Sequence, residues 1–277
     1  MDSFTSQALS NTVWAAATLD AAPPADWLAH SCDVSKEKIE FFNPQNLSNT
    51  IWALAELRYR PTDAWLRLFF DASLTKLSDF NEQNLSNVIL GLAELAVVPP
   101  PEWMAAWATR VAATIDTLNN QVLVNCLWAL TVLQMQAGDV FRSLLLQALQ
   151  VFTPVNDTRH LCSLYDVLQI AAAEKVDGLP TPGANLLDAA KNAWNIQLAE
   201  AAQQRASVDH KALMSVLREL GVAHEPEHLC LDIGRSIDIA LLDRHIAIEV
   251  DGPTHFLNTQ KRTGTTRFRN RVLSRAG

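Results

Sequence analysis

The feature that most constrains this chain is a segment that recurs at a constant interval of 38 residues. Copies begin at Gln7, Gln45, Gln83 and Gln121, with no insertion or gap between them. The clearest copy starts at Gln45 and reads QNLSNTIWALAEL. A constant period of this size indicates a stacked-repeat architecture, in which each unit buries its apolar surface against its neighbours.

Each repeat is predicted to hold two helices joined by a short turn. Residues that cap helix N-termini recur at the start of each first helix, where a side-chain oxygen accepts from a free backbone N–H: Thr5, Asn43, Asn81, Asn119 and Asp157. Apolar residues then follow four and three positions apart, which predicts one buried helical stripe. The second helix opens near a recurrent proline and carries an aromatic anchor: Trp27, Trp65, Trp103 and Phe141. We expect a mainly α fold, an α-solenoid with four clear repeats and a degraded fifth in residues 1–173.

The pattern changes after the repeats. Residues 174–230 are expected to hold a linker rich in proline and glycine and two further helices, at 184–204 and 208–220. Alternating apolar residues at 236–241 and 245–250 then predict a β-hairpin, and the basic stretch 265–275 predicts a helix. Residues 231–277 should therefore form a small α/β module of their own.

Charge is unevenly distributed along the chain. Residues 1–170 carry 17 acidic and 9 basic side chains, whereas residues 255–277 carry six basic and no acidic ones. A nucleic acid would be drawn by charge to the C-terminal segment, while the acidic array suits a protein partner. No apolar run is long enough to span a bilayer, so no membrane contact is expected. The four cysteines lie far apart and form no CxxC pair, which predicts buried free thiols.

Two parts of the sequence resemble known families. The QxLSNxxWALA helix and its 38-residue period resemble the octotricopeptide repeat family. The stretch from Ile237 to Leu273, with its IDIA, IAIEVDGPTHF and TTRFRNRVL segments, is similar to the RAP domain, which is thought to have a restriction-endonuclease-like fold. The resemblance implies a factor that binds single-stranded RNA in the chloroplast or mitochondrion and supports transcript processing, stability or translation. RAP domains continue beyond the position of Gly277, and no organellar leader is visible, so we expect a partial gene product.

A column of asparagines is the candidate RNA reader of the repeats. It occupies one mid-helix position in every clear repeat, although asparagine is a poor helix former: Asn11, Asn49, Asn87 and Asn125. One hypothesis is a ladder of side-chain hydrogen bonds between adjacent repeats, and the other is amide contact with RNA bases. Trp14, Trp52 and Trp128 could stack on bases, but their helical spacing beside leucine and alanine favours core positions.

Three carboxylates of the hairpin are the candidate catalytic residues. Glu249 and Asp251 alternate onto one strand face, and Asp238 stands on the neighbouring strand, so the three could hold Mg²⁺. Asp251 stands where the restriction-endonuclease-like motif has its lysine, and Lys261 is a speculative substitute. A structural or RNA-positioning role is therefore favoured over a metal-dependent ribonuclease. No metal site or cofactor is assigned, except Mg²⁺ if the nuclease hypothesis holds.

The basic C-terminal residues are candidates for phosphate binding, with a solvated surface as the alternative: Lys261, Arg262, Arg267, Arg269 and Arg271. His255 is expected to be a structural, hydrogen-bonded residue. Three functions follow from the sequence. The favoured one is a non-enzymatic RNA-binding factor, and the others are a metal-dependent ribonuclease and a protein-binding scaffold.

Overall fold

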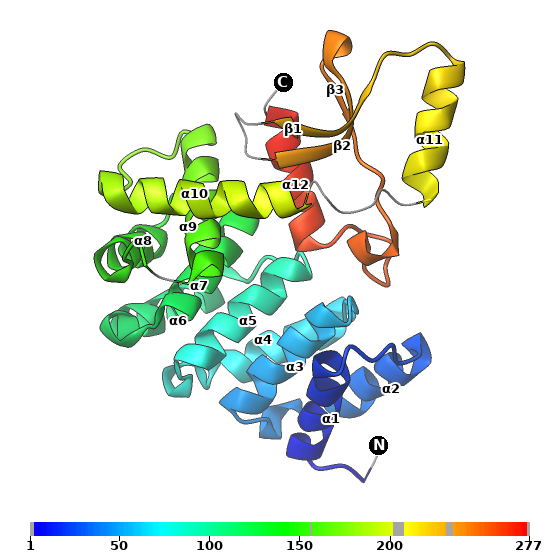
Figure 1. Ribbon diagram of the computed structural model, residues 1–277. Coiled ribbons are helices and arrows are strands. Elements are labelled where there is room, and N and C mark those ends of the chain that lie inside the picture. The colour runs from blue at the N-terminus through cyan, green and yellow to red at the C-terminus, as the bar shows by residue number, and fades with distance from the viewer. Residues whose placement is uncertain (1–2, 156, 202–207, 231–234, 276–277) are drawn as a thin grey trace. The chain divides into compact units, whose positions relative to one another are not determined.

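The computed structural model describes residues 3–155, 157–201, 208–230 and 235–275 (Figure 1). They form two compact units. The first comprises Met1–Val151, Asp177–Pro180 and Thr254–Arg267, and the second comprises Phe152–Val176, Thr181–Pro253 and Phe268–Gly277. The fold is mainly helical with one small sheet, which confirms the predicted class.

The first unit is a stack of helix pairs. Its first helices are α1 (Ser6–Thr18), α3 (Pro44–Glu56), α5 (Glu82–Glu94) and α7 (Asn120–Val132). Its second helices are α2 (Ala25–Lys36), α4 (Asp63–Leu74), α6 (Pro101–Thr114) and α8 (Asp139–Val151). Each first helix packs on the next first helix, and each second helix on the next second helix (Figure 1). The 38-residue period is thus a two-layer stack, as predicted.

Helix starts follow the predicted capping residues. All five residues are N-caps, and each side chain accepts from a backbone N–H of the first turn: Thr5, Asn43, Asn81, Asn119 and Asp157. In α3, Asn43 accepts from the Asn46 N–H at 2.8 Å while the Asn46 side chain accepts from the Asn43 N–H at 3.3 Å. This reciprocal cap satisfies two helix-terminal donors and fixes where the chain enters the helix.

Helix ends repeat as regularly as helix starts. In the first helices, the residue after each C-cap has a positive φ, at Asp20 (48°), Arg58 (53°), Ala96 (52°) and Gln134 (62°). The next backbone N–H returns to a carbonyl five residues earlier, as in the 2.8 Å bond from Tyr59 to Leu54. This is a Schellman ending built without glycine, so each repeat carries about 1 kcal/mol of left-handed strain.

The two layers of the stack are held together differently. Gly91 of α5 lies so close to α3 that a Cβ there would be 2.9 Å from the Ile51 carbonyl oxygen. Second helices are separated instead by fully buried indoles, and Trp65 and Trp103 donate to Ser35 Oγ at 2.7 Å and Ser73 Oγ at 2.8 Å. Small residues in one layer and aromatic rings in the other make each repeat wedge-shaped, narrower at the first helices.

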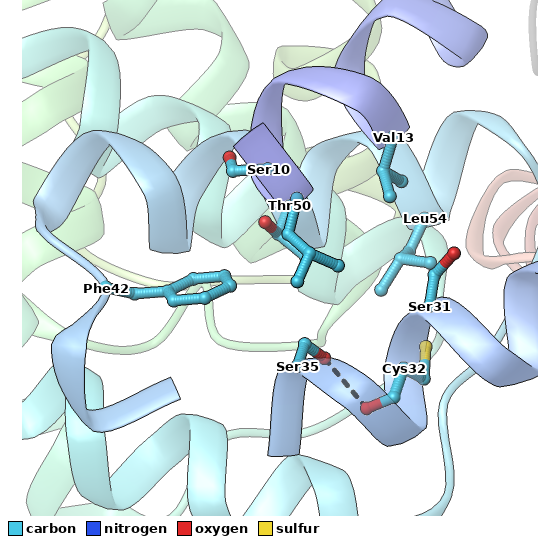
Figure 2. Close-up of a pocket in the computed structure, with 9 residues that line it drawn as sticks. Ser10, Val13, Ser31, Cys32, Ser35, Phe42, Thr50 and Leu54 are labelled. Carbon is cyan, nitrogen blue, oxygen red and sulfur yellow. Dashed lines mark hydrogen bonds between the residues drawn. The ribbon is translucent and has the colours of Figure 1, made fainter. Parts of the chain in front are cut away.

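A small gap remains between the first repeat and α3 of the second repeat. Figure 2 shows the side chains around it, among them Ser10, Ser31, Cys32 and Thr50. Its volume is about 10 Å³, enough for roughly one water molecule. Thr50 Oγ1 is buried there, and Ser35 Oγ donates to the Cys32 carbonyl at 2.8 Å. We regard this gap as a packing feature because it is too small for a ligand.

The second unit combines helices with a meander sheet. Its helices are α9 (Thr158–Ala173), α10 (Ala184–Ala201) and α11 (Val208–Glu219), and α9 packs on α10. The sheet has the order β1-β2-β3, with β1 (Glu225–Cys230), β2 (Arg235–Leu241) and β3 (Ile246–Ile248) all antiparallel. Helix α12 (Gly264–Arg275) begins in residues of the first unit and ends in residues of the second.

Comparison with the predicted elements shows both agreement and omission. The β2–β3 hairpin, α11 and α12 are confirmed, whereas β1 was not predicted. The helix predicted at 184–204 is seen to Ala201, and its last three residues lie outside the described part of the chain. The start of the predicted module, at residues 231–234, lies outside it as well.

A buried ion pair lies at the centre of the second unit. Arg235 of β2 donates to Asp166 of α9 at 2.5 Å, and its guanidinium lies 5.1 Å from the Trp194 ring centre and 5.4 Å from that of Phe268. Burial raises the pKa of Asp166, and the charge of Arg235 opposes that effect. Pairing and cation–π contact thus stabilise a charge that would otherwise be unfavourable in the interior.

The remaining expectations concern cysteines and membranes. All four cysteines are free thiols, as predicted, and three of them are buried. Within the described residues, no helix combines the length and the apolar character needed to cross a bilayer.

Candidate functional site

The first helices of the stack present one repeated surface to solvent. Between α1 and α3 it forms a hollow of about 330 Å³, lined by Asn11, Trp14, Ala15, Gln45 and Asn49. Further along, a hollow of about 260 Å³ is lined by residues of α3, α5, α7 and the start of α12: Trp52, Ala55, Glu56, Arg58, Leu90, Gly91, Glu94, Trp128 and Thr265. The two hollows share the helix positions of Trp14 and Ala15, which are filled by Trp52, Leu90, Trp128 and Gly91 in the second hollow.

The tryptophans of this surface are not core residues. Trp14 is 40% exposed, and Trp52 and Trp128 are half-buried walls of the hollows. The prediction that these three side chains are buried is wrong, whereas the second-helix residues Trp65 and Trp103 are fully buried. The reason is geometric. Close packing through Gly91 and its equivalents leaves no room between first helices for an indole, so the ring turns outward.

The asparagine column lies on the same surface. Gln83 Nε2 donates to Asn87 Oδ1 at 2.6 Å, and Gln121 Nε2 donates to Asn125 Oδ1 at 2.8 Å. Asn125 Nδ2 in turn donates to Ser86 Oγ of the preceding repeat at 3.2 Å. The hydrogen-bond ladder between repeats is therefore present at Asn125, while Asn11 and Asn49 line the hollow between α1 and α3. At Asn87 and Asn125 the glutamine bond fixes the orientation of the amide, because the side-chain oxygen is the acceptor.

Two carboxylates of this surface were not predicted from the sequence. Glu56 and Glu94 stand at the ends of α3 and α5, 38 residues apart, and both line the hollow of about 260 Å³. Burial raises the pKa of Glu56, and the neighbouring charge of Glu94 raises it further. Glu94 Oε2 accepts from Thr265 N at 3.1 Å and from Thr265 Oγ1 at 2.7 Å. Their identical position in two consecutive repeats is a sequence signal by which they could have been found.

The segment 254–267 belongs to the first unit and lies against α3 and α5. Asn258 accepts from Arg60 N at 2.8 Å and donates to the Arg60 carbonyl at 3.3 Å. Gly264 lies on the backbone of α5, where a Cβ would be 2.0 Å from the Ala93 oxygen. His255 Nδ1 and Thr266 Oγ1 are 3.0 Å apart, in keeping with the structural role expected for this histidine.

Three of the predicted phosphate-binding residues are exposed on this segment. Lys261, Arg262 and Arg267 all face solvent. Lys261 lies close enough to Asp63 to help lower the pKa of that carboxyl, after the larger effect of the Arg60 hydrogen bond. The guanidinium of Arg262 stands 6.0 Å from the Phe256 ring centre. These three side chains bring positive charge to the otherwise acidic first unit.

The predicted catalytic carboxylates come together in the second unit, around an arginine. Arg269 Nη1 lies 3.1 Å from Glu249 Oε2, and its Nη2 pairs with Asp251. Asp238 Oδ2 accepts from the Val250 N–H at 2.7 Å. Burial raises the pKa of Glu249 to about 7, although Arg269 acts in the opposite direction. A guanidinium thus occupies the space between two of the three carboxylates, which favours a structural role for them.

Arg271, the last of the predicted RNA-binding residues, is also paired with a carboxylate. Arg271 Nε lies 2.9 Å from Glu174 Oε1, and Arg275 Nη1 lies 3.1 Å from the same oxygen. Arg269 and Arg271 are therefore partly buried ion-pair residues, and their side chains are 20% and 14% exposed. The structure gathers Lys261, Arg262 and Arg267 at one surface and places Arg269 and Arg271 elsewhere.

Comparison with known proteins identifies the repeat region. Residues 2–170 match the family model described as the Tbc2 translation factor, N-terminal domain. No curated protein matches the chain. The matched range coincides with the predicted repeat array, and the family is one of helical repeats similar to the octotricopeptide type. Because this match covers more than half of the sequence, the chain belongs to the family of the Tbc2 translation factor N-terminal domain.

Proposed function

We propose that this protein binds single-stranded RNA on the surface of its first helices and acts as a translation factor for organellar transcripts. The family description names a translation factor, and the surface offers the chemistry that RNA recognition needs. The observation that carries the proposal is positional. Glutamine, asparagine and an aromatic or apolar residue recur at fixed positions on successive first helices. The hollow between α1 and α3 is lined by Asn11, Gln45 and Asn49, and the next hollow is lined by Trp52, Leu90 and Trp128.

Each group on this surface has a counterpart on RNA. Asparagine N–H₂ groups can donate to base carbonyls, and Glu56 and Glu94 can accept from base amino groups. Trp52 and Trp128 offer ring faces for stacking, which tolerates any base. One such set per 38-residue unit suits reading by repeats, with each unit addressing a short piece of the strand.

Attraction to phosphate comes from the segment that carries Lys261, Arg262 and Arg267. Residues 1–170 have a net charge of −8, so this surface needs a local source of positive charge. The three exposed side chains supply it at residues that belong to the same unit as the hollows. For single-stranded RNA, three phosphate contacts predict that the logarithm of the binding constant falls with the logarithm of the salt concentration with a slope of about −2.

We also propose that residues 231–277 form a RAP-like module and act as a second RNA contact. The β2–β3 hairpin and α12 support this reading, as do the residues from Glu249 to Phe256 that resemble the RAP signature. In this proposal the protein acts in the chloroplast or mitochondrion, and its effects on transcript processing or stability follow from binding. Glu249 and Asp251 position α12 through their ion pairs with Arg269.

The test is RNA binding by the whole chain, measured by fluorescence anisotropy with a random single-stranded pool. Trp52→Ala should weaken binding roughly fivefold or more, since a base loses its stacking partner. Leu68→Ala is the matched control, because Leu68 is a 40% exposed apolar residue on a second helix. Arg267→Ala should reduce the salt slope by about 0.7, with Arg67→Ala of α4 as its control.

Three outcomes would overturn the proposal. Absence of RNA binding at low salt would favour a protein-binding scaffold, for which the acidic repeat array is suited. Equal losses in Trp52→Ala and Leu68→Ala would show that the first-helix surface is not the binding face. If RNA is cleaved in Mg²⁺ and Asp238→Ala abolishes the cleavage, the ribonuclease alternative takes the place of the binding role.

A further inference from the structure

We infer that His210, Glu227 and Asp238 form a binding site for a first-row divalent metal ion such as Zn²⁺ or Mn²⁺. The three side chains come from α11, β1 and β2, and their ligand atoms all lie within 4.8 Å of one another. His210 Nδ1 is 3.3 Å from Glu227 Oε1. The site is independent of the proposed RNA surface, which lies on residues of the other unit.

The sheet register places two of the ligands together. Pro226 pairs with Ile239 and His228 pairs with Ile237, so Glu227 stands across from Asp238 on the neighbouring strand. Glu227 has a φ of 49°, a left-handed conformation that is unusual for a residue within a strand. His210 enters from the first turn of α11 and is 3% exposed. Residues far apart in sequence thus converge on one point.

The local charge favours a cation at this point. Glu249 and Asp251 have Arg269 as their charged partner, whereas Glu227 and Asp238 face each other beside His210. Burial raises the pKa of Glu227, and the negative charge of Asp238 raises it further, while His210 acts in the opposite direction. Two neighbouring carboxylates repel each other when ionised, and a divalent ion between them would remove that repulsion.

The donor set indicates which metal would bind. One imidazole nitrogen with two carboxylate oxygens suits Zn²⁺ or Mn²⁺, whereas Mg²⁺ prefers oxygen ligands and an octahedral shell. Metal–ligand distances near 2.0–2.2 Å would require the three side chains to close by rotamer changes around the ion. With three protein ligands, the fourth position would be taken by water. The bound ion would also join α11 to the sheet.

The experiment uses the full chain after dialysis against EDTA and labels its seven histidines with ¹⁵N. Titration with Zn²⁺ should shift the ring nitrogens of His210 at one equivalent, and calorimetry should give a stoichiometry of one. Mn²⁺ should broaden the same signals, and Mg²⁺ should bind at least tenfold more weakly. Saturating Zn²⁺ should raise the melting temperature by roughly 5 °C, provided that it binds only the folded chain.

Variants separate this site from chance metal binding. His210→Gln and Asp238→Asn should each lower Zn²⁺ affinity at least tenfold, and Asn at 238 can still accept the Val250 N–H. His228→Gln is the matched control, because His228 Nδ1 pairs with Glu225 Oε2 at 2.8 Å on the same strand as Glu227. No shift of the wild-type His210 signals, or equal losses in His210→Gln and His228→Gln, would overturn the inference. The wild-type spectra decide the matter even if a variant fails to fold.

Discussion

Replacing Glu249 by glutamine is expected to remove a pH-dependent loss of stability from the second unit. Burial raises the pKa of Glu249 from 4.5 to about 7, with Arg269 opposing the shift and Asp238 and Asp251 adding to it. Glutamine keeps the shape of the side chain and an acceptor for Arg269, but it carries no charge. The comparison of the two proteins therefore isolates the free energy of ionising one carboxyl group.

The direction and size of the effect follow from proton binding. Below pH 4.5 the carboxyl is protonated in both the folded and the unfolded chain, so it contributes nothing to pH dependence. Between pH 4.5 and about 7 the folded chain holds a proton that the unfolded chain has released, so the free energy of unfolding falls as pH rises. The pKa difference corresponds to about 3 kcal/mol, and partial solvent access reduces this to roughly 2 kcal/mol.

The assay is urea unfolding at pH 4.5, 6 and 7.5 in EDTA, followed by the methyl resonances of Ile239 and Ile248. Relative to wild type, Glu249→Gln should gain about 2 kcal/mol between the lowest and the highest pH. Asp243→Asn, at an exposed residue of the hairpin turn, is the control for a general charge effect. The reasoning is refuted if Glu249→Gln and wild type keep a constant difference across this range, or if the variant loses stability as pH rises.

Three further predictions concern packing and reactivity. Arg235→Met should lower the free energy of unfolding, measured by urea denaturation, by about 3–5 kcal/mol, because Asp166 would stay buried without its cation. The double variant Arg235→Met/Asp166→Leu should recover much of that loss. Gly91→Ala should cost about 1–3 kcal/mol in thermal unfolding, since its Cβ would stand 2.9 Å from an α3 backbone oxygen, whereas at Gly138 the nearest atom is 3.5 Å away and Gly138→Ala should have little effect. A thiol reagent at pH 8 should label the folded protein at Cys230 alone, because burial raises the pKa of Cys32, Cys126 and Cys162 to about 11 or 12. Rapid labelling of any of those three buried cysteines would refute this prediction.

The repeat architecture could be predicted because its signals are local and recur. An N-cap such as Asn43 acts on the N–H groups three residues away, so its role can be recognised without knowledge of the fold. The same holds for Gly221, which ends α11 with a φ of 66°. Repetition at a fixed interval then showed which of these signals belong together.

The outward-facing tryptophans could not be predicted because their burial depends on the distance between helices. Trp52 and Trp65 are both surrounded by apolar residues in sequence, yet Trp52 is half-buried at the surface and Trp65 is fully buried. The small residues that bring first helices together decide the difference, and their effect appears only when two repeats are placed side by side. A composition argument assigns both side chains to the core.

The ion pairs of the second unit are also invisible to sequence reasoning. Arg269 belongs to a basic run, which suggested solvent or phosphate as its partner, but its guanidinium reaches carboxylates 18 and 20 residues earlier. His210 and Glu227 lie in segments with no motif, and they meet only because α11 places His210 beside β1. Contacts of this kind arise from tertiary placement, for which the chain carries no short-range signal.

The unequal layers of the stack have a mechanical consequence. Close backbone approach at Gly91 sets the separation between first helices, whereas the side chains of Trp65 and Trp103 separate the second helices. We expect that, when such an array flexes, the spacing of the second helices changes more than that of the first helices. The intervals between Asn49, Asn87 and Asn125 would then stay constant while the array bends. Bending of the array would then leave the spacing of its RNA-facing positions unchanged.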